Sequence, residues 1–135
     1  MSQSRRDFLR ILPVGAVAAL TLRPRPLSGA IIHPDPRPGI DGSGVLTREA
    51  LAAFPEETIT IYDMVRKIPH IADGIGCACG CSVMPGYRSL LTCYSEGGMA
   101  MGCAICQGEA RLAYRRHQEG QDLDQIRRAI DARFG

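Results

Sequence analysis

The six cysteines are the residues whose type and spacing can do chemistry, and all of them fall between positions 77 and 106. They form a C-x-C-x-C run, one isolated residue and a C-x-x-C pair: Cys77, Cys79 and Cys81; Cys93; Cys103 and Cys106. Three thiols within five residues can converge on one ion because a loop can wrap around it. A C-x-x-C pair at the start of a helix lies beside backbone N–H groups that favour thiolates. The pattern therefore predicts that these cysteines bind a soft metal ion.

Copper(I) and zinc are the metals that the pattern favours. Zinc takes four Cys or His ligands, whereas copper(I) accepts two or three thiolates or thioethers. Met84, Met99 and Met101 flank the cysteines and favour copper(I) slightly, although methionines also fill irregular gaps in small cores. An iron–sulfur electron-transfer protein is a further alternative, but the spacing matches neither ferredoxin pattern.

A disulfide framework is the main alternative to a metal site, because an exported domain with an even number of cysteines can oxidise them. Bridges inside the C-x-C-x-C run would close strained rings. Each of its three cysteines would then pair with one of the three later ones, which leaves six of the fifteen possible connectivities. Thiol redox chemistry is the weaker alternative, because no βαβ pattern surrounds the C-x-x-C pair.

The elements that must position the cysteines are predicted to be helices. Apolar residues recur at helical spacing, the breaks fall at proline or glycine, and strand patterns are lacking. The pattern predicts helices over residues 47–54, 56–68, 103–119 and 123–134, a turn over 70–76, and a short helix or extended piece over 89–94. The fold class is therefore all-α: a small single helical domain, residues 47–135, with a central Cys-rich loop.

Two local signals mark the helix boundaries in the C-terminal part. Asp122 and Gln125 have the spacing of a capping box, which begins the last helix, and Gly120 is suited to end the helix before it. The six arginines of these two helices, Arg127 among them, are predicted to lie on solvated faces.

Residues 31–46 contain three prolines and three glycines, so they cannot be helical and are predicted to form an exposed linker. From Ile31 onward the chain has 11 basic and 13 acidic residues, a net charge of −2. A near-neutral body without a basic stripe gives no footprint for nucleic acid. Nucleic-acid binding is therefore excluded as a predicted function.

Residues 1–30 are predicted to be a twin-arginine signal peptide. Arg5 and Arg6 are followed by a spacer, by Phe8, and by twelve uncharged residues, Ile11 to Leu22. As a helix that stretch would span about 18 Å, too little for a membrane core, so it is predicted to be a signal segment rather than an anchor. The twin-arginine translocase moves folded proteins, and its typical cargo already holds a cofactor.

The function that follows is a periplasmic or extracellular protein that binds copper(I) or zinc as a carrier, chaperone or sensor. Its expected partners are the metal ion, the translocase during export, and a metal-receiving periplasmic or membrane protein. No nucleophile–base set, paired carboxylates or phosphate loop is present, so we do not expect an enzyme. A disulfide-stapled interaction module without metal remains the alternative.

The histidines are predicted to lie apart from the metal site. His33 falls in the linker and His70 in a turn. His117 is about 16 Å along a helix from Cys106, too far to share its ion.

Residues 68–134 resemble a family of small exported bacterial proteins named for a Pro-Cys-Tyr-Cys-Gly-Cys motif. The matching motifs are Cys77-Ala78-Cys79-Gly80-Cys81, Ser89-Leu90-Leu91-Thr92-Cys93-Tyr94 and Gly102-Cys103-Ala104-Ile105-Cys106. Metal binding is what the Cys and His pattern of this family suggests. The resemblance therefore implies an exported metal-binding protein.

Two positions depart from the family pattern. Tyr87 and Met99 stand where the family usually has histidine. If those histidines are ligands, their replacement weakens the prediction of zinc. A Met99 thioether would preserve a copper(I) site, so Met99 joins the six cysteines as a predicted ligand.

Overall fold

The computed structural model describes residues 31–135 of the chain, and the predicted signal peptide lies outside these residues. The described part contains helices and turns and no strand, which confirms the all-α class. Its elements are α1 (Glu56–Lys67), α2 (Pro69–Asp73), the short 3₁₀ helices η4 (Cys81–Val83) and η5 (Leu90–Tyr94), α3 (Ala104–Gln118) and α4 (Leu123–Phe134). Within residues 31–135, no helix is both long enough and apolar enough to cross a membrane.

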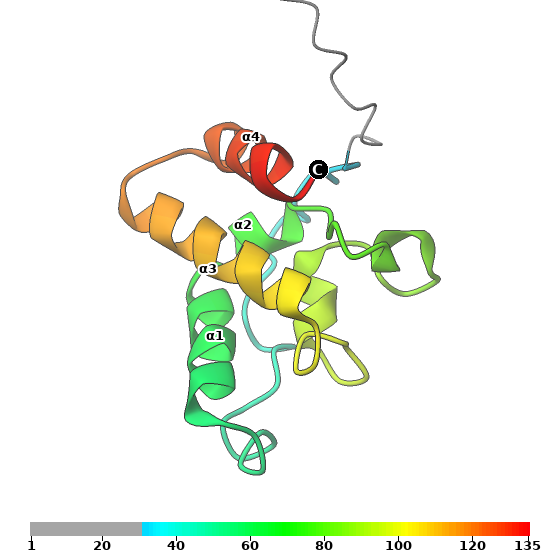
Figure 1. Ribbon diagram of the computed structural model, residues 1–135, viewed down its shortest axis with the longest axis vertical. Helices are drawn as coiled ribbons and strands as arrows, with labels where there is room; N and C mark the ends of the chain where they lie inside the picture. The colour runs from blue at the N-terminus through cyan, green and yellow to red at the C-terminus, as the bar shows by residue number, and fades with distance from the viewer. Residues whose placement is uncertain (1–30) are drawn as a thin grey trace, which may run out of the picture.

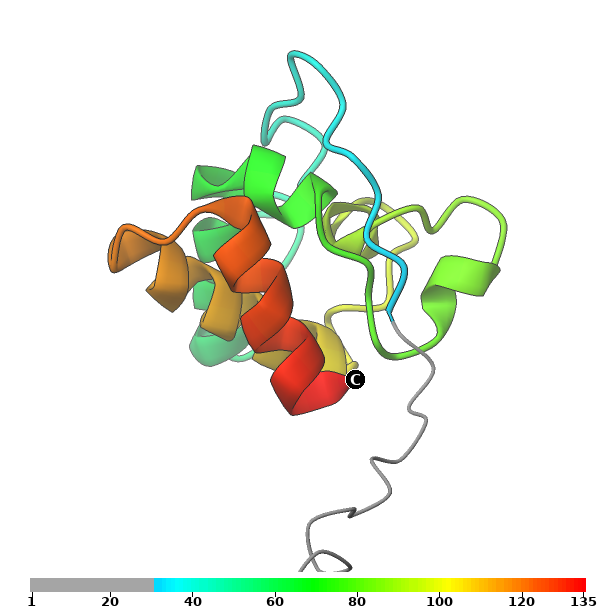
Figure 2. The same ribbon diagram turned by 90° about the horizontal axis from the view of Figure 1, so that it is seen from above.

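Helix α3 is the centre of the fold, with α4 packed on one side and α1 on the other (Figure 1). Ile61 and Val65 of α1 are buried as the helical stripe predicts, and Tyr62 between them meets Tyr94 of η5 edge-on, with ring centroids 4.7 Å apart. The cysteine-bearing segments lie together beside the first turn of α3 (Figure 2). The helices therefore form the scaffold of the domain, and the cysteine-bearing segments pack beside the start of α3.

The boundaries of α3 and α4 follow the predicted local signals. The Asp122 carboxylate accepts from the Gln125 N–H at 2.8 Å, and the Gln125 amide oxygen accepts from the Asp122 N–H at 2.9 Å, which completes the capping box. Gly120 adopts φ +82°, the left-handed conformation that ends α3. Helix α4 then buries Ile126 and Ile130.

Two predicted elements are wrong, a helix at residues 47–54 and a turn at residues 70–76. Residues 47–54 form successive turns rather than a helix, because the segment is only two turns long and Pro55 restricts the residue before it. The segment still buries Leu51. The predicted turn at 70–76 instead begins with the short helix α2, since Pro69 has the fixed φ suited to a first helical position.

Residues 31–46 are non-helical, as predicted, but they lie along the domain instead of standing apart as an exposed linker. The His33 ring accepts the Gly76 N–H at 3.1 Å, and Val45 is buried. Arg127 of α4 donates to the carbonyl of Pro34 at 2.8 Å and to that of Gly74 at 2.9 Å, so its predicted solvated position is also wrong. The segment stays against the domain because its prolines form no regular backbone hydrogen bonds. The Pro34 carbonyl is therefore free to accept from the Arg127 side chain.

Gly76 is where this N-terminal segment crosses the start of the cysteine loop. A Cβ added there would lie 2.1 Å from the Ile32 carbonyl oxygen. We expect Gly76→Ala to lower the free energy of unfolding by about 1–3 kcal/mol, because backbone on both sides must shift. Urea unfolding of the reduced protein measures this.

Gly102→Ala is the matched control for that variant. A Cβ at Gly102 meets no atom within 4 Å, so its effect should stay within about 0.5 kcal/mol. Equal losses in the two variants would show that the crossing at Gly76 is not a tight contact.

Candidate metal centre

Three segments bring the cysteines together. The loop after α2 carries Cys77 and Cys79, and Cys81 at its end begins η4. Cys93 lies in η5. Cys103 is the N-cap of α3, where its sulfur accepts the Cys106 N–H at 3.4 Å. All six predicted cysteine ligands are therefore collected in one place, although 29 residues separate the outermost two.

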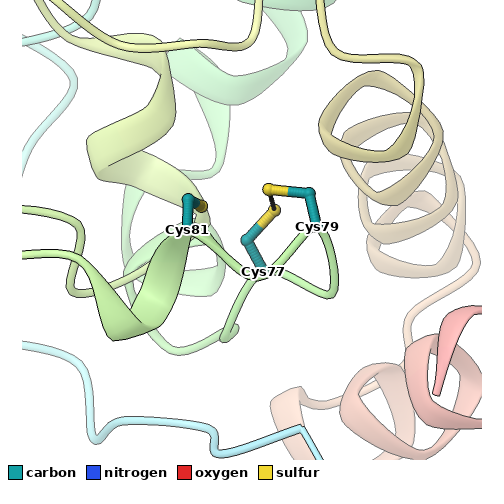
Figure 3. A group of neighbouring side chains, drawn as sticks. All are labelled: Cys77, Cys79 and Cys81. Carbon is teal, nitrogen blue, oxygen red and sulfur yellow. Dashed lines mark hydrogen bonds between the residues drawn. The ribbon is translucent and has the colours of Figure 1, made fainter.

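Three sulfurs form the core of this cluster, and we call them the central triangle. The Sγ atoms of Cys77 and Cys79 point toward each other (Figure 3) and are 3.2 Å apart. Those of Cys77 and Cys106 are 3.3 Å apart, and those of Cys79 and Cys106 are 3.7 Å apart. Sulfurs of a tetrahedral zinc–thiolate site are about 3.8 Å apart, so the Cys79–Cys106 pair has that spacing and the other two pairs lie closer together.

Each remaining sulfur lies against one edge of the central triangle and completes a triad of sulfurs within 4.8 Å of one another. The three triads are Cys77, Cys79 and Cys81; Cys77, Cys93 and Cys106; and Cys79, Cys103 and Cys106. The sulfurs of Cys81 and Cys93 also meet, at 3.2 Å. The cluster is therefore one continuous array rather than two separate sites.

All six cysteines are free thiols, and their exposure divides them into two groups. Cys77, Cys81, Cys93 and Cys106 are buried, whereas Cys79 and Cys103 are partly exposed. A shallow hollow lined by Ile31, Ile32 and Val83 opens beside Cys77. An ion can therefore reach the array from solvent at its outer side and be enclosed at its inner side.

The thiols differ in how readily they ionise. Burial would raise the pKa of Cys79, but hydrogen bonds with Cys81 and Cys77 outweigh it, and the pKa of Cys79 lies below its ordinary value. The hydrogen bond with Cys106, together with burial, raises the pKa of Cys77 well above the ordinary value. Thiolates are the metal-binding form, and of these two thiols the partly exposed Cys79 ionises more readily.

Glu109 lies one turn beyond Cys106 on α3 and is fully buried, a position that the sequence pattern did not single out. Its Oε1 accepts the Ala78 N–H at 2.9 Å, while its Oε2 has no hydrogen-bond partner. Burial raises the pKa of Glu109, although the nearby Cys77 thiol and the Ala78 N–H oppose the rise. The carboxyl group thus ties the cysteine loop to α3 between its first two thiols.

Replacing Glu109 tests this tie. We expect Glu109→Ala to lower the free energy of unfolding by about 1–3 kcal/mol, because the buried Ala78 N–H loses its acceptor. Glu109→Gln keeps an acceptor oxygen and should recover most of that stability. Thermal unfolding of the reduced protein compares the two, and equal losses would show that the hydrogen bond to Ala78 contributes little.

Asp73 is a second buried acid that the sequence pattern missed. Its carboxylate accepts hydrogen bonds from the Arg37 side chain at 2.8 Å, from the Arg37 backbone N–H at 2.8 Å and from the Ser89 hydroxyl at 3.0 Å. It also forms an ion pair with Arg88 at 2.9 Å. These partners come from the N-terminal segment and from the residues before η5. Asp73 therefore joins the segments on either side of the cysteine loop.

Met99, Tyr87 and the histidines are the other residues that the sequence brings into question as ligands. Met99 is in a turn and 36% exposed, so its thioether stays a predicted ligand only. The Tyr87 hydroxyl donates to the Gly97 carbonyl at 2.7 Å. His70 and His117 stack edge-on with ring centroids 5.9 Å apart, on α2 and α3.

No protein-family model, no curated protein and no solved structure matches this chain. The fold and the site therefore define its class by themselves: a small all-helical protein with six clustered thiols at metal-binding distances.

Proposed function

We propose that this protein is an exported carrier or chaperone for a soft metal ion, with copper(I) favoured over zinc. The observation that carries the proposal is the array of six free thiols, which three separate segments bring within metal-binding distance. Gathering six thiols side by side leaves their sulfurs largely to one another, and a soft cation would satisfy them together. The resemblance to a family whose cysteine pattern suggests metal binding agrees with this proposal.

The grouping of the sulfurs supports copper(I) over zinc. A closed zinc site takes four Cys or His ligands around one ion. The sulfur triads described above have three members each and include no histidine. Three thiolates form a trigonal site, which suits copper(I) and leaves zinc short of one ligand.

Export and delivery complete the proposal. The signal predicted for residues 1–30 would send the folded protein through the twin-arginine route, with its metal already bound. In the periplasm or outside the cell, the partly exposed Cys79 and Cys103 could pass the ion to a receiving protein. The protein would bind and transfer the ion without catalysing a reaction.

Elemental analysis combined with thiol counting tests the proposed function. The protein is purified anaerobically from the export compartment, and the lysine variant Arg5→Lys/Arg6→Lys serves as the export control. We expect stoichiometric copper, thiols that react only after chelation or denaturation, and retention of the control in the cytoplasm. Metal-free protein with six freely reactive thiols would contradict the proposal.

A three-disulfide interaction module is the second candidate, and the sulfur pairs favour one connectivity for it. Cys77 lies 3.3 Å from Cys106 and Cys81 lies 3.2 Å from Cys93, which leaves Cys79 to pair with Cys103. This is one of the six connectivities that the sequence allows. Peptide mapping under non-reducing conditions would show these three bridges and no bound metal.

A further inference from the structure

We propose that the six thiols hold several copper(I) ions as one copper–thiolate cluster, rather than a single ion. The inference rests on the proposed function and deepens it, because it specifies how many ions the site takes and how they share ligands. Its basis is that three sulfur triads coexist in the structure and overlap at their corners.

The three triads share sulfurs in a regular way. Each sulfur of the central triangle, Cys77, Cys79 and Cys106, belongs to two triads, and each outer sulfur belongs to one. Six ligands thus offer three trigonal sites, provided that the central thiolates each bridge two ions. Thiolates can bridge in this way because sulfur keeps further lone pairs after it binds one soft cation.

The outer sulfurs indicate a fourth site. The central triangle is one face, and each outer sulfur lies close to two of its corners. If the three outer sulfurs also met one another, the six sulfurs would form an octahedron. The triads are three of its four alternate faces, and the fourth is formed by Cys81, Cys93 and Cys103. Cys81 and Cys93 are already 3.2 Å apart, so only Cys103 has to approach. As a partly exposed N-cap, Cys103 is the outer cysteine with the most room to move.

Charge balance favours filling that fourth site. Loading releases one proton from each of the six thiols to the solvent, and copper enters and remains as copper(I), so no oxidant or reductant is needed. Three ions among six thiolates leave a net charge of −3, and a fourth ion reduces it to −2. The N-terminus of α3, which begins at these sulfurs, offsets part of the remaining negative charge.

Anaerobic titration of the reduced, metal-free chain with copper(I) in acetonitrile tests the cluster, with native mass spectrometry to count bound ions. We expect species with three or four ions per chain to appear early, while singly and doubly loaded chains stay minor, because bridging ligands make loading cooperative. X-ray absorption should show about three sulfur neighbours per copper and a short copper–copper contribution. Ser82→Ala, which keeps every thiol, should load identically.

The outcomes separate the cluster from the proposed function. One copper ion per chain without copper–copper scattering would overturn the cluster while leaving a copper carrier. Two zinc ions bound in preference to copper would also overturn it and would make the protein a zinc carrier. A chain that binds neither metal would overturn the cluster and the proposed function together.

Discussion

Cys77→Ser is expected to reduce the copper content from three or more ions to about one per chain. Cys77 belongs to two of the three triads, and its loss leaves only the triad of Cys79, Cys103 and Cys106. A serine hydroxyl is a hard ligand that copper(I) binds poorly, so the substitution removes the ligand while nearly preserving the shape. Native mass spectrometry of the copper(I)-loaded variant measures the change.

Cys103→Ser is the matched comparison, because it is the same chemical change at a sulfur that belongs to one triad. This variant should keep at least two ions. The difference between the variants depends on bridging by Cys77, not on the number of cysteines, since both retain five. Equal copper content in the two would contradict the shared-corner arrangement.

Asp73→Asn is expected to lower the free energy of unfolding at pH 7 by about 3 kcal/mol. The Asp73 carboxylate is fully buried. The Arg37 side chain and backbone N–H and the Ser89 hydroxyl donate to it, and Arg88 forms an ion pair with it. An amide in its place accepts fewer bonds and carries no charge. Asp124 forms an ion pair with Arg127, and its side chain is 72% exposed. Asp124→Asn should therefore lower the free energy of unfolding by less than about 0.5 kcal/mol.

The cost of Asp73→Asn should depend on pH. Burial alone would raise the pKa of Asp73, but the hydrogen bonds from Arg37 and Ser89 outweigh it and hold the pKa below its ordinary value. A lowered carboxyl pKa stabilises the fold above the unfolded pKa of about 3.9, and the gain is lost as the pH falls through the folded value. Urea unfolding at pH 7 and at pH 3 should show the difference between the wild type and the variant shrinking at the lower pH.

Helices α1, α3 and α4 could be predicted because their signals are local. The capping box at Asp122 and the apolar stripe of residues 56–68 each lie within a few turns of chain. The six-cysteine cluster could be predicted as a set because the C-x-C-x-C run and the C-x-x-C pair have spacings typical of metal ligands. What spacing alone left open was which sulfurs meet.

The contacts that hold the cluster in place could not be predicted, because they join residues far apart in the chain. Asp73 binds Arg37 across 36 residues, and Glu109 reaches Ala78 across 31. A single acidic residue in a helical segment gives no sequence signal that identifies such distant partners. The N-terminal segment was misjudged similarly: its prolines exclude a helix, but they do not show that Arg127 and His33 fasten it to the domain.

Bound ions would also close loops: ions that bridged Cys77 to Cys106 and Cys81 to Cys93 would connect chain positions 29 and 12 residues apart. A ligand that binds only the folded chain at a concentration a thousandfold above its Kd stabilises that chain by about 4 kcal/mol. Metal-loaded chains should therefore unfold far less often than empty ones and survive proteases much longer. Protein abundance would then follow copper supply through turnover alone.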